Sequence, residues 1–145
     1  MTYRPDPGQS YLRVATQTAS PGQLVLMLYD GAIRFLERAR LGFGADDPLE
    51  FNQTIHNNVV RAQEILFELN VALNLEQGGE LATTLRRLYD YMDRQLDESN
   101  RSKKEPGILD VIGRLTILRD AWAEMLRKNE NANQAPEEVS LSVLG

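Results

Sequence analysis

Four long segments with helical periodicity, separated by short breaks, are the feature that most constrains the fold of this sequence. In each segment, apolar residues recur at steps of three and four, which is the spacing of an α-helix that buries one face. The sequence has no sustained alternation of apolar and polar residues of the kind that predicts strands. The expected helices cover about residues 21–40, 48–74, 80–99 and 106–129.

The ends of these segments carry residues that are typical of helix starts and stops. Ser20, Pro21 and Gln23 match a capping box, with the serine as N-cap and the proline at the first helical position. Residues 47–50 repeat this arrangement at the second helix, and glycine-containing breaks lie at residues 42–44 and 77–79.

The lengths of the segments predict how the helices are arranged. At about 1.5 Å per residue, each helix is roughly 30 Å long or a little longer. Matched lengths and short connections are typical of antiparallel neighbours, so we predict an all-α, up-down four-helix bundle over residues 20–128. Residues 1–19 are expected to form a less ordered N-terminal segment, and residues 129–145 a flexible tail.

The predicted core stripes of the second, third and fourth helices are Phe51, Ile55, Val59, Ala62, Leu66, Leu69 and Leu73; Leu81, Leu85, Leu88, Met92 and Leu96; and Ile108, Val111, Ile112, Leu115, Leu118, Trp122 and Leu126.

The composition argues against several classes of function. The 145 residues include no cysteine and one histidine, so disulfides and thiolate metal sites are excluded and an imidazole cluster is disfavoured. The net charge of −5 argues against nucleic-acid binding, which usually needs a basic face. No apolar run approaches the roughly 20 residues of a membrane span, and residues 1–9 lack the apolar centre of a signal peptide. We therefore expect a cytoplasmic protein without membrane insertion, metal or cofactor.

Apolar residues remain on the outer faces after the core stripes are assigned. On the second helix Val60, Phe67 and Val71 lie roughly opposite the core stripe. On the fourth helix a line at spacing four consists of Leu109, Gly113, Ile117 and Ala121. These residues are either ordinary exposed hydrophobes, or are covered by the N-terminal segment, or form a groove for an amphipathic partner segment.

Two glycines inside helices, Gly31 and Gly113, bear on the same question. Each costs about 1 kcal/mol relative to alanine, and close approach of another backbone would explain their presence. That backbone belongs either to a partner or to a neighbouring helix of the bundle, and the sequence leaves both alternatives open.

His56 is the residue that an enzymatic alternative would use. Histidine phosphotransfer domains are four-helix bundles with a histidine that is followed by a lysine three residues on and then a glycine. Here Val59 and Val60 occupy those positions, so both expected residues are missing. No nucleophile elbow, dimetal Glu-x-x-His motif or phosphate-binding glycine loop is present in the sequence. We interpret His56 as a residue at the boundary of core and solvent and expect no enzymatic activity, with phosphotransfer as the alternative function.

Several stretches resemble one protein family, the flagellar export chaperones called FliS. The signature-like run covers residues 18–32, with the sequence TASPGQLVLMLYDGA. Collinear similarities follow at Asn58 with Ala62-Gln63 and Glu68-Leu69, at residues 88–92 (LYDYM), and at residues 119–122 (RDAW). Tyr11, ahead of Val14 and Thr16, is similar to the family's N-terminal tyrosine segment.

This resemblance implies a function. FliS proteins bind the disordered C-terminal segment of flagellin in the cytoplasm, prevent its premature polymerisation and aid its delivery to the flagellar type III export gate. The bound segment wraps around the bundle, partly extended and partly as short helices. A flagellar regulator such as an anti-sigma factor is a further partner to consider.

Surface geometry then suggests which residues contact flagellin. The candidate contacts are Tyr11, Val14, Tyr29, Ile33, Val60, Phe67, Val71, Leu109 and Ile117. Together with Tyr3, the first two are expected to lie over the groove when substrate is absent. Tyr89 and Tyr91 are expected to pack at opposite edges of the third-helix stripe while their hydroxyl groups stay in solvent.

Overall fold

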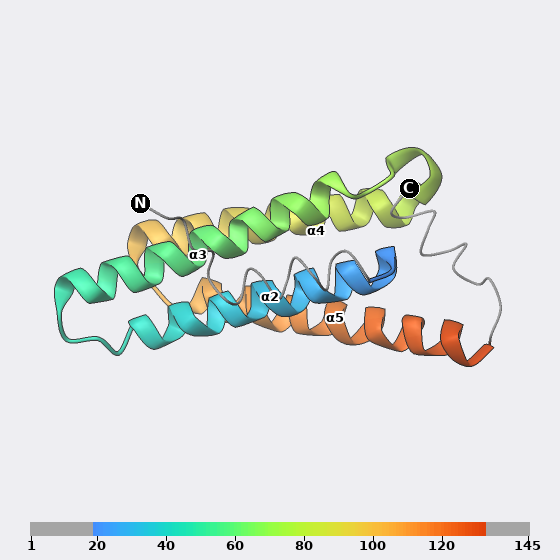
Figure 1. Cartoon of the computed structure of the whole chain (residues 1–145). Coiled ribbons are helices and arrows are strands. Elements are labelled where there is room, and N and C mark those ends of the chain that lie inside the picture. The colour runs from blue at the N-terminus through green and yellow to red at the C-terminus, as the bar shows by residue number, and fades with distance from the viewer. Residues whose placement is uncertain (1–18, 133–145) are drawn as a thin grey trace, which may run out of the picture.

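The computed structural model describes residues 19–132, and these form four helices (Figure 1). The helices are α2 (Pro21–Gly42), α3 (Pro48–Val71), α4 (Leu75–Ser102) and α5 (Pro106–Ala132). No strand occurs within residues 19–132. The predictions made for residues 1–18 and 133–145 lie outside the described residues.

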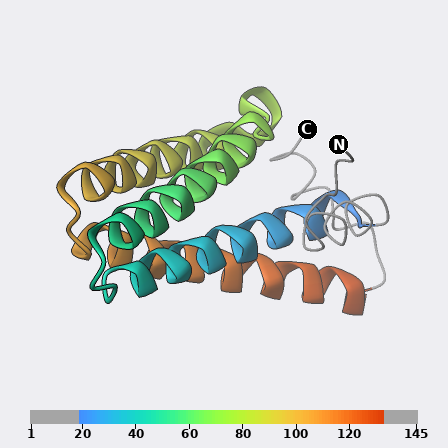
Figure 2. The same ribbon diagram turned by 60° about the vertical axis from the view of Figure 1, so that its left-hand side comes forward.

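The helices form a ring in which each one has two principal neighbours. α2 packs against α3 and α5, and α4 packs against the same two helices. Successive helices run in opposite directions, as Figures 1 and 2 show. This arrangement confirms the predicted up-down bundle, and it places α3 and α5 at opposite corners of the ring.

The first two helices begin as the sequence predicts. The N–H of Gln23 donates to the hydroxyl of Ser20, and the N–H of Ser20 donates to the side-chain oxygen of Gln23, both at 3.2 Å. The carboxylate of Asp47 accepts from the N–H of Glu50 at 2.9 Å. Each cap satisfies backbone donors that have no partner within the helix.

The connection between α3 and α4 differs from the prediction. α3 ends at Val71, because Asn74 is already the N-cap of the next helix and accepts from the N–H of Gln77 at 3.0 Å. α4 therefore begins at Leu75, before the predicted start at Glu80. The predicted break survives as a kink at Gly79, whose φ of 58° lies in the left-handed region that glycine adopts without strain.

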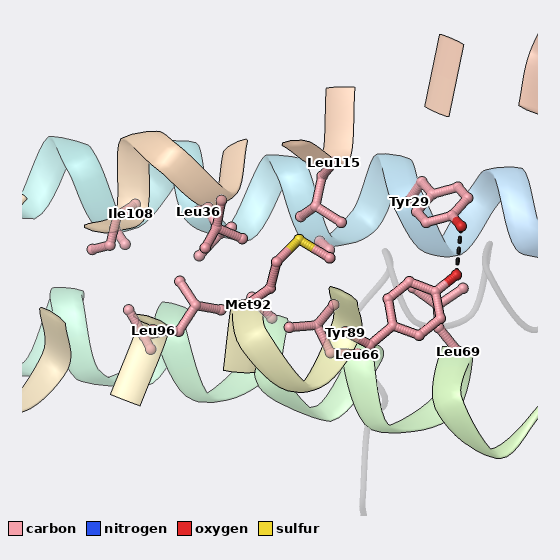
Figure 3. Close-up of a cluster of buried hydrophobic side chains, with 14 of the residues drawn as sticks. Tyr29, Leu36, Leu66, Leu69, Tyr89, Met92, Leu96, Ile108 and Leu115 are labelled. Atoms are coloured by element: carbon pink, nitrogen blue, oxygen red, sulfur yellow. Dashed lines mark hydrogen bonds between the residues drawn. The ribbon is translucent and has the colours of Figure 1, made fainter. Parts of the chain in front are cut away.

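The core lies along the axis of the ring, where the four helices meet (Figure 3). It contains buried residues of all four helices, and most members of the predicted stripes are buried or pack against it. Leu81 is the exception: its side chain is 48% exposed, whereas Ala82 is fully buried. The stripe of α4 continues back from Leu85 through Ala82, so Leu81 lies one residue away from the face that points inward.

Two glycines in α2 mark close helix contacts inside the bundle. A Cβ atom on Gly22 would lie 2.6 Å from Cδ2 of Leu126, and the Gly22 carbonyl accepts a hydrogen bond of 2.7 Å from the Trp122 indole. A Cβ atom on Gly31 would lie 3.2 Å from Cδ1 of Ile65 in α3. Packing within the bundle therefore explains Gly31, and no partner needs to be invoked for it.

Candidate binding surfaces

The outer face of α3 carries an exposed pair of large apolar side chains. Phe67 and Val71, one turn apart, are 67% and 63% exposed. They lie on the side opposite Leu66 and Leu69, which are buried in the core. Val60, two turns earlier on the same line, is half-buried. The prediction of an exposed line on this helix is therefore confirmed for its last two members.

An open hollow lies along the first turns of α4, which begins four residues after Val71. Leu75 lines it together with the kink residue Gly79 and with Glu80, Thr83, Thr84 and Arg87, and its volume is about 480 Å³. Leu75 and Leu81 add further exposed apolar surface at this end of the bundle. These exposed residues at the start of α4 were not among the predicted contacts, because the early start of α4 was not predicted.

The outer face of α5 carries a second apolar line. Leu109 and Ile117 are 41% and 70% exposed, with Gly113 between them. A Cβ atom on Gly113 would meet nothing within 4 Å among the described residues. Close packing inside the bundle therefore does not account for this glycine, in contrast to Gly31.

The two apolar surfaces face different directions. α3 and α5 occupy opposite corners of the ring, and each packs mainly against α2 and α4 (Figure 2). A single short helix therefore cannot cover both surfaces, whereas a longer segment that bends around the bundle can reach each in turn.

The candidates on α2 are placed differently from the prediction. Tyr29 is only 1% exposed, and its hydroxyl forms a 2.5 Å hydrogen bond with the hydroxyl of Tyr89 in the core (Figure 3). The prediction that Tyr29 is a surface contact was therefore wrong. The prediction that the Tyr89 hydroxyl faces solvent was also wrong. Ile33 is half-buried and packs against the core. Tyr11 and Val14 lie outside the described residues.

Burial governs the ionisation of the two paired tyrosines. Desolvation raises the pKa of Tyr29, although its hydrogen bond with Tyr89 acts in the opposite direction. Desolvation also raises the pKa of Tyr89, and the neighbouring Tyr29 adds to that increase. Both hydroxyls therefore stay protonated at neutral pH and form a neutral polar pair in an otherwise apolar core.

A polar cluster joins α4 to α5. The Tyr91 hydroxyl donates to the Asp110 carboxylate at 3.0 Å, and Gln95 and Arg114 also donate to it. Partial desolvation raises the pKa of Asp110, but these three donors outweigh it and hold the pKa below its usual value. Because every member has a partner in the cluster, we read it as a structural link between helices.

His56 lies on the surface of the bundle, beside α4. Its side chain is exposed, and its Nδ1 atom lies 3.0 Å from the amide nitrogen of Asn100. Within residues 19–132, no group of three or more histidine, cysteine, aspartate or glutamate residues is placed to hold a metal ion. In the same range, no helix is long and apolar enough to cross a membrane.

The surroundings of Gly113 predict the sign of a stability change. Gly113→Ala should raise the free energy of unfolding by about 1 kcal/mol, because alanine favours the helix and its methyl group meets nothing. Gly107→Ala, in the same helix, is the matched control: its Cβ would lie 3.2 Å from the backbone oxygen of Gln95 and would collide with the Ser99 hydroxyl. We expect that change to destabilise the protein. Urea unfolding measures both, and a destabilised Gly113→Ala protein would contradict the exposed position of this glycine.

Comparisons with known proteins identify the family of this chain. The family model described as "Flagellar protein FliS" matches residues 5–129. The flagellar secretion chaperone FliS of Bacillus subtilis is 37% identical over 123 residues, which cover 84% of this chain and 87% of that protein. The protein of the same name from Salmonella typhimurium is 37% identical over 115 residues, covering 79% and 82% of the two chains. The Campylobacter jejuni protein of this name is 35% identical over 79% of this chain and 86% of its own. The chain therefore belongs to the FliS family of flagellar proteins.

Proposed function

We propose that this chain is a cytoplasmic secretion chaperone that binds the disordered C-terminal segment of flagellin. Its relatives are named flagellar secretion chaperones, which supports a flagellar protein as the substrate. The observation that carries the proposal is the large apolar surface left exposed on the outer faces of α3 and α5. Apolar side chains that gather on one outer face and are rimmed by polar residues are typical of protein-binding sites.

The mechanism is non-covalent masking of an assembly surface. Flagellin's terminal helices associate with one another in the filament, so a chaperone that covers their apolar face prevents polymerisation. Phe67 and Val71 serve as anchors on α3, and Leu109 and Ile117 serve as anchors on α5. Because these pairs lie at opposite corners, the bound segment bends around the bundle. Val60, Ile33, Tyr11 and Val14 are further proposed contacts.

The expected affinity is moderate. Burial of one large apolar side chain contributes about 1.5–3 kcal/mol, while ordering a flexible segment and losing its free motion oppose binding. A few such anchors lead to a dissociation constant of about 1 μM, or roughly −8 kcal/mol. Such a complex protects the substrate and still releases it at the export gate, where we propose that the chaperone–flagellin complex docks. An anti-sigma factor or another flagellar regulator is a further proposed partner.

Titration calorimetry with a peptide from the C-terminus of the same organism's flagellin tests this proposal. We expect a one-to-one complex of micromolar affinity or tighter, and no binding of a peptide with the same composition in scrambled order. A light-scattering assay should then show that stoichiometric amounts of the protein delay flagellin polymerisation. Absence of binding to the native peptide would overturn the proposal, and phosphate transfer from a kinase to His56 would replace it with the phosphotransfer alternative.

A further inference from the structure

Where α2 and α3 pack together, the aromatic ring of Phe35 is shared by two arginines, and we call this place the Phe35 site. The guanidinium carbon of Arg38 lies over the ring of Phe35, 5.5 Å from its centroid. The guanidinium carbon of Arg61, from the neighbouring helix, lies 5.6 Å from the same centroid. Arg34 precedes Arg38 by one helical turn and is also exposed. Three positive charges therefore gather along one side of the bundle.

These three arginines form no ion pair among the described residues. Five other arginines are paired with carboxylates within 4.0 Å, namely Arg40, Arg101, Arg114, Arg119 and Arg127. Glu64 and Glu68, on the next turns of α3, are exposed but form no salt bridge with Arg61 within residues 19–132. The Phe35 site therefore carries the unpaired charges of Arg38 and Arg61, with Arg34 one turn away, on a chain whose net charge is −5.

The N–H donors of both guanidinium groups are available, because neither Arg38 nor Arg61 forms a hydrogen bond or an ion pair within residues 19–132. A guanidinium group presents five donors in a planar fork. Those donors match the two oxygens of a carboxylate, and the ring limits the freedom that each side chain loses when it binds. Phe35 is itself half-buried and packs against the core, so the ring that carries the two charges has a fixed position.

We propose that the Phe35 site binds an acidic stretch of the secreted partner, with aspartate or glutamate carboxylates on Arg38 and Arg61. The inference rests on the proposed chaperone function. It adds that the bound segment of the substrate is negatively charged. A short acidic peptide fits better than nucleic acid, because the negative net charge of the protein repels a long polyanion.

The Phe35 site lies near the apolar anchor Phe67 on the same helix. Arg61 and Phe67 are six residues apart on α3, which corresponds to about 9 Å along the helix axis and a turn of about 120° around it. An extended segment that follows this turn spans the distance with about four residues. The preferred substrate segment therefore carries acidic residues close in sequence to the large apolar residue that packs on Phe67.

The test is the affinity for the flagellin C-terminal peptide at two salt concentrations. The double variant Arg38→Gln/Arg61→Gln should bind about tenfold more weakly than the wild type at roughly 0.05 M salt, where exposed charges are poorly screened. The difference should nearly vanish at about 1 M salt. Arg94→Gln is the matched control, because Arg94 is an exposed arginine on α4 that has no salt bridge among the described residues. Its affinity should equal that of the wild type.

Each other outcome has a distinct meaning. If the wild type binds the peptide and the double variant binds equally well at low salt, the acidic-segment inference is overturned while the chaperone function stands. If the wild type does not bind, the chaperone function fails and the inference fails with it. If the double variant instead loses affinity for a short single-stranded oligonucleotide that the wild type binds, the occupant is a nucleic acid and the inference is overturned. Circular dichroism should show the wild-type helical spectrum for all variants, and the double variant should lose no more unfolding free energy than the roughly 0.5–1 kcal/mol that each exposed cation–π contact contributes.

Discussion

Phe67→Ala should weaken binding of the flagellin C-terminal peptide by about ten- to a hundredfold. The side chain is 67% exposed in the free protein, so burying it against a partner contributes roughly 1.5–3 kcal/mol, and each 1.4 kcal/mol corresponds to about a factor of ten. The free energy of unfolding should change little, because truncation at an exposed position creates no core cavity. Calorimetry and urea unfolding of the same protein measure the two quantities.

The neighbouring residue supplies the control for this prediction. Leu66 is 2% exposed, and Leu66→Ala should lower the free energy of unfolding by about 2–5 kcal/mol through lost packing and a residual cavity. Two truncations at adjacent positions thus have opposite consequences. Normal binding by Phe67→Ala together with a large loss of stability would show that Phe67 belongs to the core. Normal binding with normal stability would show that this part of α3 is idle surface and would leave the α5 line as the main anchor.

The architecture could be predicted because local signals and long-range packing agree along most of the chain. The Ser20 capping box and the Asp47 cap fix two helix starts through contacts within three residues. The stripes of α3 and α5 have one apolar face each, so periodicity alone separates Leu66 from Phe67. A difference of one residue in sequence is a rotation of about 100° on a helix, which is enough to distinguish core from surface.

Prediction failed where periodicity does not choose a face. α2 is apolar around most of its circumference, so the sequence does not indicate that Tyr29 points inward rather than outward. Its partner Tyr89 lies 60 residues away, and no local pattern connects the two. At the start of α4, the capping role of Asn74 competes with the two glycines that suggested a break, and the helix begins early. The Phe35 site could not be predicted for the same reason, since Arg38 and Arg61 meet only when α2 and α3 pack together.

The tyrosine pair yields a prediction about the core itself. The two hydroxyl groups lie 2.5 Å apart, and no other hydrogen-bond partner of either is found among the described residues. Tyr29→Phe should therefore leave the Tyr89 hydroxyl buried without a partner, and Tyr89→Phe should do the same to Tyr29. Each single variant should lose about 1–3 kcal/mol of unfolding free energy, which is the usual penalty for an unsatisfied buried polar group.

The double variant separates this explanation from a simple loss of packing. When both hydroxyls are replaced by hydrogen, no polar group remains unsatisfied, so Tyr29→Phe/Tyr89→Phe should be less destabilised than either single variant and close to the wild type. Tyr91→Phe is the matched control: it removes a hydroxyl that is only partly buried, and Asp110 keeps its hydrogen bonds from Gln95 and Arg114. Its loss should stay below about 1 kcal/mol. Urea unfolding of the four variants completes a double-mutant cycle with its control. Additive losses in the double variant would mean that the two hydroxyls act independently, and the pair would then have no role in joining α2 to α4 across the centre of the bundle.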